Sequence, residues 1–323
     1  MDEPMAHYSR FDVNGFDAEA LLGVVRDTRF EQRLLAGGQF RASVQRVVFP
    51  EFSLDSGSYN LPIFASGSFG EDLIGLAMAV NSEGPMWANG RWIPAGQIMV
   101  FAEDSELNVR PRPGGWQWAV LLIPRGVLQR EAVARLGREL QVPRSGWYSR
   151  AATAADAARL RRTVLNTLHD AAHPASLVTP AQVRGQADNL LTAFLDSVAA
   201  TDAGLPRRAL GSYSERYRDG VVRRAENYLK TQCDRAYDSR ALTSALGMGE
   251  RQLERLFRDA YGHGPCQWHQ MARLNLARSA LRRARGQGAV TEVAIRYGFG
   301  HLGRFSVMYR DMFGESPRDT LRG

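Results

Sequence analysis

Four polar side chains near the end of the chain are of the types that read base pairs. Arginine pairs bidentately with guanine, glutamine with adenine, and glutamate accepts a hydrogen bond from cytosine. The residues are Arg251, Gln252, Glu254 and Arg255, with Arg258 less than one helical turn further on. Carried on a single helix, this set would present base-reading groups to a DNA major groove.

The segment that carries these residues is repeated. Residues 257–265 return as residues 309–317, so each position is displaced by 52, and Leu253 falls in the same register on Phe305. Two copies of one supersecondary unit therefore occupy the last third of the chain. In the second copy the corresponding candidate residues are His301, Leu302, Gly303, Arg304, Ser306, Val307 and Arg310.

Each copy has the pattern of a helix-turn-helix, over about residues 238–261 and 290–313. In the second copy, apolar residues share one helical face until Gly298 ends the helix, and another helix follows. In the first copy, Gly247 separates a leading helix from a helix over residues 250–261. Two short helices joined by a glycine turn form the motif whose second helix enters the major groove.

A long helix is expected between the two units. Pro265 suits its first turn, and packing residues follow at helical spacing before Gly286. About 18 residues at ~1.5 Å each give roughly 27 Å. Together with the helices at its ends, this length is compatible with recognition helices in successive major grooves, about 34 Å apart.

The excess positive charge is confined to the same region. The chain has 41 Lys+Arg and 34 Asp+Glu, and residues 213–323 hold 20 of the basic and 12 of the acidic residues. The net charge is therefore +8 over residues 213–323 and −1 over residues 1–212. An arginine-rich coding bias explains why Lys230 is the only lysine, but it does not explain this asymmetry. The asymmetry is typical of a phosphate-binding module attached to an electrically neutral domain.

The stretch from Val290 to Pro317 resembles the signature of AraC/XylS-type bacterial transcription regulators, and the resemblance extends over about residues 215–323. It implies a DNA-binding domain of two helix-turn-helix subdomains joined by one long helix. Such regulators usually activate transcription from double-stranded promoter DNA, which makes RNA polymerase an expected partner. Matched to the family pattern, Arg251 and Arg255 face the groove.

The two recognition helices differ in the chemistry they offer. Leu302, Gly303 and Val307 stand where relatives often carry polar or basic groups. These three residues offer only apolar contact, for instance to a thymine methyl group, while Arg304 and Arg310 could hold phosphates. We therefore predict that the first motif supplies most sequence discrimination and the second mostly affinity.

The first 200 residues have the pattern of a β domain. Short apolar or alternating runs are separated by turn signals, and Asn89-Gly90 is a strong hairpin signal. Many short strands favour a small antiparallel barrel or jelly roll, and the family resemblance points to a cupin-like sensor domain. The expected strands cover residues 44–49, 74–80, 86–93, 98–101, 107–110 and 116–123. The expected fold class is therefore multi-domain α+β, with an N-terminal cupin-like antiparallel β-barrel, trailing helices and an all-α C-terminal domain.

Two amphipathic helices follow the strands, at about residues 154–200. The second opens with a capping box formed by Thr179 and Gln182, with Pro180 in the first turn. Such apolar stripes usually pack on their own domain, but in this family helices after the barrel commonly supply the dimer contact, so both interpretations stay open. The candidate dimer residues are Leu160, Val164, Leu168, Leu191, Phe194 and Val198.

Residues 201–212 have the composition of a linker. They divide the chain into a sensor and dimerisation domain over residues 1–200 and a DNA-binding domain over residues 213–323. At 323 residues the chain is long enough for two domains with cores of their own.

Tryptophans concentrate in the expected strands. Trp116, Trp118, Val120 and Leu122 share one face by two-residue alternation. Ordinary core packing explains this pattern, and so does an aromatic-lined cavity for a small-molecule effector with an arginine for an anionic group. The candidate ligand residues are Trp87, Trp92, Trp116, Trp118, Arg91 and Arg110.

No catalytic or metal-binding pattern stands out. Before residue 200 the only histidines are His7, His169 and His173, and none falls on an expected strand. Cys233 and Cys266 are the only cysteines, which excludes a disulfide framework and a four-cysteine zinc site. We therefore expect no catalytic residues, no metal, no cofactor and no enzymatic activity.

No apolar run approaches the ~18 residues of a membrane span and no secretion signal is evident, so a cytoplasmic protein without a membrane partner is expected. The favoured function is a homodimeric, effector-controlled, DNA-binding activator of transcription. One alternative keeps DNA binding but makes the first domain a dimerisation or protein-binding module without a small molecule. The other is a cupin enzyme with a helical appendage.

Overall fold

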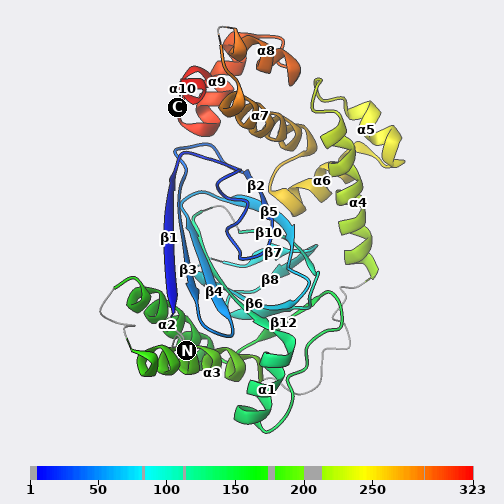
Figure 1. Cartoon of the computed structure of the whole chain (residues 1–323). Coiled ribbons are helices and arrows are strands. Elements are labelled where there is room, and N and C mark those ends of the chain that lie inside the picture. The colour runs from blue at the N-terminus through cyan, green and yellow to red at the C-terminus, as the bar shows by residue number, and fades with distance from the viewer. Residues whose placement is uncertain are drawn as a thin grey trace.

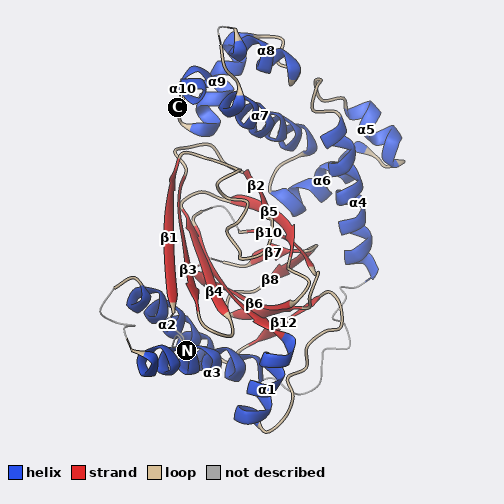
Figure 2. Cartoon of the chain, in the orientation of Figure 1, coloured by secondary structure: helices blue, strands red, loops and turns tan. Residues whose placement is uncertain are grey.

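The computed structural model describes residues 6–81, 84–111, 114–173, 179–199, 213–286 and 288–322. Two antiparallel sheets occupy the centre, three helices lie at one end of them, and the C-terminal helices lie at the other (Figures 1 and 2). The expected linker at residues 201–212 lies outside the described residues. Among the helices that are described, none is long and apolar enough to cross a membrane.

The larger sheet has seven strands in the order β1-β3-β4-β11-β6-β9-β12. They are β1 (His7–Asn14), β3 (Arg41–Val48), β4 (Ser53–Tyr59), β6 (Leu73–Asn81), β9 (Gln97–Phe101), β11 (Trp116–Pro124) and β12 (Trp147–Ala151). Successive side chains of a strand point to opposite faces. On β11, Val120 and Leu122 therefore join the core between the sheets, while Leu121 and Ile123 join a second core behind the sheet.

The smaller sheet has five strands in the order β2-β5-β10-β7-β8. They are β2 (Glu31–Leu34), β5 (Ile63–Ser68), β7 (Met86–Ala88), β8 (Arg91–Ile93) and β10 (Glu106–Arg110). Strands β7 and β8 form the predicted hairpin, and Asn89 and Gly90 have positive φ angles of 43° and 87°, as a type I′ turn requires.

The expected closed barrel is not confirmed. In the part of the chain that the structure describes, hydrogen bonding is confined within each sheet, with β1 and β12 at the edges of one and β2 and β8 at the edges of the other. The N-terminal domain is therefore a sandwich of two open antiparallel sheets, held together by side-chain packing between their inner faces.

Three helices cover the outer face of the larger sheet: α1 (Arg125–Leu136), α2 (Ala154–Ala171) and α3 (Pro180–Ala199). The predicted capping box forms, because the Thr179 N–H donates to Gln182 Oε1 (3.0 Å) and the Gln182 N–H donates to Thr179 Oγ1 (3.3 Å). The six candidate dimer residues Leu160, Val164, Leu168, Leu191, Phe194 and Val198 are all buried against the sheet and each other. A dimer contact made by α2 and α3 would have to use other residues, on their exposed faces.

The C-terminal helices are α4 (Tyr213–Thr231), α5 (Ser239–Leu246), α6 (Glu250–Tyr261), α7 (Pro265–Arg283), α8 (Ala289–Arg296), α9 (Leu302–Phe313) and α10 (Pro317–Arg322). The internal repeat persists in three dimensions. Helices α6 and α9 both have 12 residues, and their first and last residues are 52 positions apart. Helix α7 lies between the two helix-turn-helix units, as predicted (Figure 1).

Candidate nucleic-acid interface

The first helix-turn-helix motif consists of α5 and α6. The Asp238 carboxylate caps α5 by accepting hydrogen bonds from the backbone of Arg240 and Ala241, and Gly247 ends the helix with a φ of 61°. Helix α6 then buries one stripe of side chains: Leu253, Leu256, Phe257, Ala260 and Tyr261. This stripe fixes the rotation of α6 about its axis, so the opposite face is presented outward.

The base-reading candidates lie on that outward face. Arg251, Gln252, Arg255 and Arg258 are exposed. Glu254 is half-buried and forms an ion pair with Arg258 at 2.8 Å, so part of its acceptor capacity is already used within the helix. In the described part of the chain Arg255 has no ion pair, which leaves its guanidinium free to approach a guanine.

The second motif consists of α8 and α9, and its turn has less space than the first. Gly298 has a φ of 71°, and a Cβ atom there would lie 2.7 Å from the Cα of Arg235 and 2.8 Å from the carbonyl oxygen of Asp234. The guanidinium of Arg273 donates to the Tyr297 carbonyl (2.7 Å) and lies 4.1 Å from the centre of the Phe299 ring. The turn is therefore packed closely against the rest of the domain.

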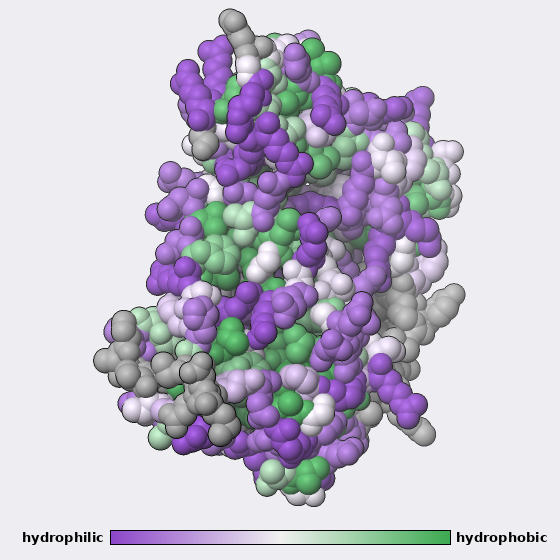
Figure 3. All heavy atoms as spheres, viewed as in Figure 1, coloured by the Kyte–Doolittle hydropathy of each residue, from purple (hydrophilic) through white to green (hydrophobic). Residues whose placement is uncertain are grey.

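The outward face of α9 is less polar than that of α6. Leu302 is 41% exposed and Val307 is 58% exposed. Arg304 and Arg310 are also exposed, while Ser306 is half-buried and donates to the Leu302 carbonyl within the helix. The remaining candidates His301 and Gly303 are exposed as well. On the face shown in Figure 3, hydrophilic side chains are prominent over the C-terminal helices at the top of the view.

Helix α7 sets the separation of the two motifs. Its 19 residues give a length of about 28 Å at ~1.5 Å per residue. Most of the helix is buried, including Trp268, Leu274 and Leu281. A rigid, buried connection of this length holds the two recognition helices at a fixed spacing, as binding to successive major grooves requires.

The structure divides most of the six candidate ligand residues between the cavity and the outer face of the smaller sheet, where Arg110 lies over the rings of Trp87 and Trp92. Trp116 and Trp118 line a cavity between the two sheets. Trp92 is 41% exposed on β8, and Arg91 stacks over the Trp147 ring at 5.2 Å. Trp87 and Arg110 lie on the other face of the smaller sheet and contact the C-terminal helices. The proposed pairing of tryptophans with an arginine for an anionic ligand is therefore not formed in the cavity.

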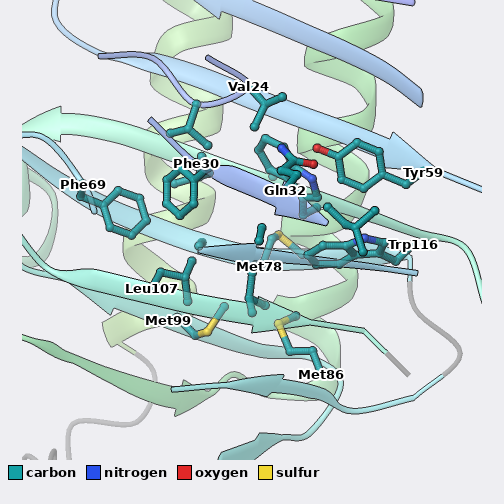
Figure 4. A pocket seen from close by; sticks show the side chains of 18 residues that line it. Val24, Phe30, Gln32, Tyr59, Phe69, Met78, Met86, Met99, Leu107 and Trp116 are labelled. Carbon is teal, nitrogen blue, oxygen red and sulfur yellow. The ribbon is translucent and has the colours of Figure 1, made fainter. Parts of the chain in front are cut away.

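The cavity has a volume of about 60 Å³, several times the roughly 10–15 Å³ that one water molecule occupies by the same kind of measure. Its walls are aliphatic, aromatic and thioether groups, including Phe30, Phe69, Leu107 and Met99 (Figure 4). None of the residues that line it is an aspartate, glutamate, lysine, arginine or histidine.

Three polar atoms in the cavity wall form no hydrogen bond of regular geometry with the described residues: Gln32 Oε1, the Tyr59 hydroxyl and Trp116 Nε1. The three side chains lie on the same side of the cavity (Figure 4). Burial raises the pKa of Tyr59 to about 12, although Gln32 and Trp118 lie close enough to oppose the shift. The phenol therefore stays protonated and can donate, while an unpaired buried polar atom costs about 1–3 kcal/mol.

Gln32 and Tyr59 were missed by the sequence analysis. Neither β2 nor β4, which carry them, was expected as a strand, so the two-residue alternation that identified Trp116 and Trp118 could not be applied to them. The one usable signal was their type, because a glutamine and a tyrosine beside apolar neighbours are polar groups that need partners when buried.

Comparison with known proteins bears mainly on the C-terminal third of the chain. A family model described as a helix-turn-helix domain matches residues 242–323. The chain is 35% identical over 104 residues to the probable thc operon regulatory protein of Rhodococcus erythropolis, covering 32% of this chain and 31% of the relative. It is 34% identical over 100 residues to the XylDLEGF operon transcriptional activator of Pseudomonas putida, covering 31% of each chain. The match thus spans about a third of the length of these relatives.

Two solved structures are also similar. One is a probable AraC family transcriptional regulator from Rhodopseudomonas palustris, at 32% identity over 32% of this chain and 95% of that chain, with a TM-score of 0.29. The other is the AraC-like transcriptional activator CuxR, at 14% identity over 83% of this chain and 95% of that chain, with a TM-score of 0.40.

Two helix-turn-helix motifs in register, joined by a buried helix and carrying exposed arginines, define a double helix-turn-helix DNA-binding domain. The sequence matches place this domain more narrowly. Through its C-terminal domain the chain belongs to the AraC/XylS family of transcription regulators.

Proposed function

We propose that the protein is a sequence-specific DNA-binding activator of transcription, controlled by a small molecule in the N-terminal cavity. The observation that carries the first part is the pair of recognition helices with exposed Arg251, Arg255, Arg304 and Arg310. The similarity to a protein named as a transcriptional activator supports activation. An activator near a promoter would act on RNA polymerase. A homodimer, formed through exposed residues of α2 and α3, would double the number of DNA contacts.

The cavity supports the second part and specifies the chemistry of the effector. Its walls lack ionisable side chains other than the phenol of Tyr59, so a charged ligand would lose its hydration without gaining a partner. The effector is therefore a small uncharged molecule, mostly apolar. It carries one group that can accept from Tyr59 or Trp116 and donate to Gln32, as a hydroxyl group can.

Selection of preferred sites from random DNA by the full-length protein tests DNA recognition. We expect a defined site with two subsites about one helical turn apart, and an affinity that falls steeply with salt because phosphate contacts release counterions. Binding that shows no sequence preference, or no dependence on salt, would contradict the proposal.

A thermal-shift screen tests effector control, because a ligand that binds only the folded state raises its apparent stability. Uncharged aromatic alcohols should raise the melting temperature, and matched aromatic carboxylates should not. Tyr59→Phe serves as the control variant, since it keeps the ring and removes only the hydroxyl, and it should reduce the shift. If the carboxylates bind better than the alcohols, the assignment of an uncharged effector is wrong.

A further inference from the structure

The smaller sheet separates the cavity from the DNA-binding domain. Because side chains alternate along a strand, neighbouring residues point to opposite faces of the sheet. On four strands, one residue lines the cavity and its neighbour contacts the C-terminal helices. The pairs are Gln32 and Arg33 on β2, Ala65 and Phe64 on β5, Met86 and Trp87 on β7, and Val109 and Arg110 on β10.

The outer face of this sheet contacts the last residue of the first recognition helix. The ring of Tyr261 makes an edge contact with Phe64, with ring centres 5.3 Å apart, and lies 6.4 Å from Trp87. Its hydroxyl donates to Glu226 Oε2 (2.8 Å), and the other oxygen of that carboxylate lies 2.9 Å from Arg33 Nη1. Strands β2, β5 and β7 therefore reach this one tyrosine either directly or through a single carboxylate.

The Glu226 carboxylate that joins these groups is charged. Burial opposes its ionisation, but the positive charges of Arg33 and Lys230 outweigh this effect and lower the pKa of Glu226. Lys230 lies 3.1 Å from the carboxylate. A buried ion pair of this kind has a defined geometry, and removing one partner leaves the other charge unpaired. The connection from β2 to α6 therefore depends on all of these partners being in place.

Arg110, on β10, holds the same end of α6. Its guanidinium donates to the carbonyl of Ala260 and, at 2.5 Å, to the carbonyl of Asp259. The last carbonyls of a helix lack partners within the helix and carry partial negative charge, which a cation stabilises. Arg110 is only 3% exposed and stacks over Trp92 at 4.9 Å, so the side chain has little freedom to move independently of the sheet.

The second recognition helix is linked to the cavity wall less directly. Its last residue, Phe313, stacks on Phe16 with ring centres 6.4 Å apart, and Phe40 lies between Phe16 and the cavity residue Tyr59, at 5.4 Å and 5.9 Å.

The second helix-turn-helix unit and the later part of α7 contact loops of the N-terminal domain: Arg278 donates to the Phe16 carbonyl, Arg282 pairs with Asp17, and the Gly38 N–H donates to the Met312 carbonyl. Earlier along α7, the Leu34 N–H of β2 donates to Asn275 Oδ1 (3.4 Å). Phe16, Asp17 and Gly38 do not line the cavity. A change inside the cavity would therefore reach α6 through single residues of the smaller sheet, whereas it would reach α9 through two further aromatic rings or through α7.

We propose that the smaller sheet positions the first recognition helix according to what fills the cavity, while the second recognition helix keeps its place. The proposal rests on the proposed effector-controlled DNA binding and specifies how that control is exerted. A group that displaces Ala65 or Gln32 outward also displaces Phe64 or Arg33 on the opposite face, and α6 moves with Tyr261. By linkage, DNA bound by α6 changes the effector affinity of the cavity by the same factor.

A matched pair of cavity substitutions in the full-length protein tests this coupling without the effector. Ala65 and Ala77 line the same cavity from opposite walls, Ala65 on β5 and Ala77 on β6 of the larger sheet, whose other face packs against α2 and α3. Ala65→Val should change affinity for the site selected by the wild-type protein by about fivefold or more, as expected for allosteric coupling. Ala77→Val should change it by about twofold or less, as for uncoupled sites.

Footprinting and a double variant complete the test. Ala65→Val should alter protection over the subsite of α6 and leave the subsite of α9 unchanged, whereas a general loss of folding would weaken both. Adding Arg110→Ala should remove most of the effect of Ala65→Val. Phe64→Leu, which removes the ring that contacts Tyr261 and keeps an apolar side chain, replaces Arg110→Ala if that variant does not fold.

The outcomes separate this proposal from the proposed function. Equal effects of Ala65→Val and Ala77→Val, or an effect of Ala65→Val that persists in the Arg110→Ala background, would overturn the coupling through the sheet while DNA recognition still holds. Absence of specific DNA binding by the wild-type protein at low salt would instead contradict the proposed function itself.

Discussion

The two helix-turn-helix motifs share a repeat but differ in what surrounds them. Helix α6 presents Arg251, Gln252 and Arg255 and is held at its end by the smaller sheet. Helix α9 presents Leu302 and Val307 at 41% and 58% exposure, and in the described part of the chain its unit contacts loop residues of the N-terminal domain such as Phe16 and Gly38. The motif with more base-reading chemistry is thus the one in contact with the cavity wall. The two motifs have similar helices, and the contacts that each motif makes with its surroundings distinguish their expected roles in DNA binding.

The turns of the two motifs provide the largest expected contrast. Gly247 and Gly298 both have positive φ, 61° and 71°, where a residue with a Cβ costs about 1–2 kcal/mol. A Cβ at Gly247 meets nothing within 4 Å, whereas at Gly298 it meets the backbone of Arg235. Gly247→Ala should therefore lower the free energy of unfolding by about 1–2 kcal/mol. Gly298→Ala should lower it by about 1–3 kcal/mol more, because backbone atoms must move. Urea unfolding of both variants checks this, and equal losses would show that the second turn is not tighter.

Arginine substitutions test the predicted division of roles between the recognition helices. Arg255→Ala should cost about 1–3 kcal/mol of binding and relax the preference at particular bases. Arg304→Ala should weaken binding similarly across sequences and reduce the salt slope by about one unit. Site selection with each variant, together with binding across a salt series, measures both effects. A shift of base preference in Arg304→Ala but not in Arg255→Ala would reverse the assignment.

Most of the C-terminal domain could be predicted because its signals are local. Apolar spacing of three and four residues, glycines after each leading helix and a repeat of 52 positions fix the helices without knowledge of their partners. The bounds of α6 were predicted to the residue. The contact between α6 and the N-terminal domain could not be predicted, because Arg110 and Tyr261 are 151 positions apart and nothing local relates them.

The strands that were missed show where local signals fail. Strand β4 has the sequence Ser-Leu-Asp-Ser-Gly-Ser-Tyr, which looks like a loop, yet six of its seven residues are buried. Asp55 is compensated by Arg46 at 2.5 Å, and Gly57 lies beneath the Trp118 ring of the paired strand. Ser56 likewise donates to the Trp118 carbonyl (2.7 Å). These partners lie on other strands, so the strand becomes recognisable only once the sheet exists. The cavity could not be predicted for the same reason, because residues distant in sequence, from both sheets, form its walls.

Acidic pH should lower the stability of the fold around the first motif, because His269 is buried there. This residue lies on α7 with a ring nitrogen 3.1 Å from the Gln232 carbonyl, next to the Tyr237 ring. Burial lowers the pKa of His269, and the charge of Arg273 adds to the effect, while the Gln232 carbonyl and Asp234 oppose it. The folded state therefore binds a proton less readily than the unfolded chain.

The sign of the pH dependence follows from that difference. As pH falls below about 6.5, the unfolded chain takes up the proton first, so this contribution to stability is present above that pH and is lost on acidification. His269→Gln keeps a donor for the Gln232 carbonyl but cannot titrate, and its stability should depend less on pH between 7 and 5 than that of the wild type. Identical pH slopes from urea unfolding would rule out His269 as the source.

The start of α6 offers the smallest and most local test. Gly249 caps the helix without a side-chain hydrogen bond, its φ and ψ of −69° and 146° suit any residue, and a Cβ there meets nothing within 4 Å. Gly249→Ser adds a hydroxyl that can accept from a backbone N–H of the first turn, and should stabilise by a few tenths of a kcal/mol. Gly249→Ala is the matched control, because it adds the Cβ without the acceptor and should not stabilise. If melting temperatures rise equally in both, the gain comes from reduced freedom of the unfolded chain rather than from capping.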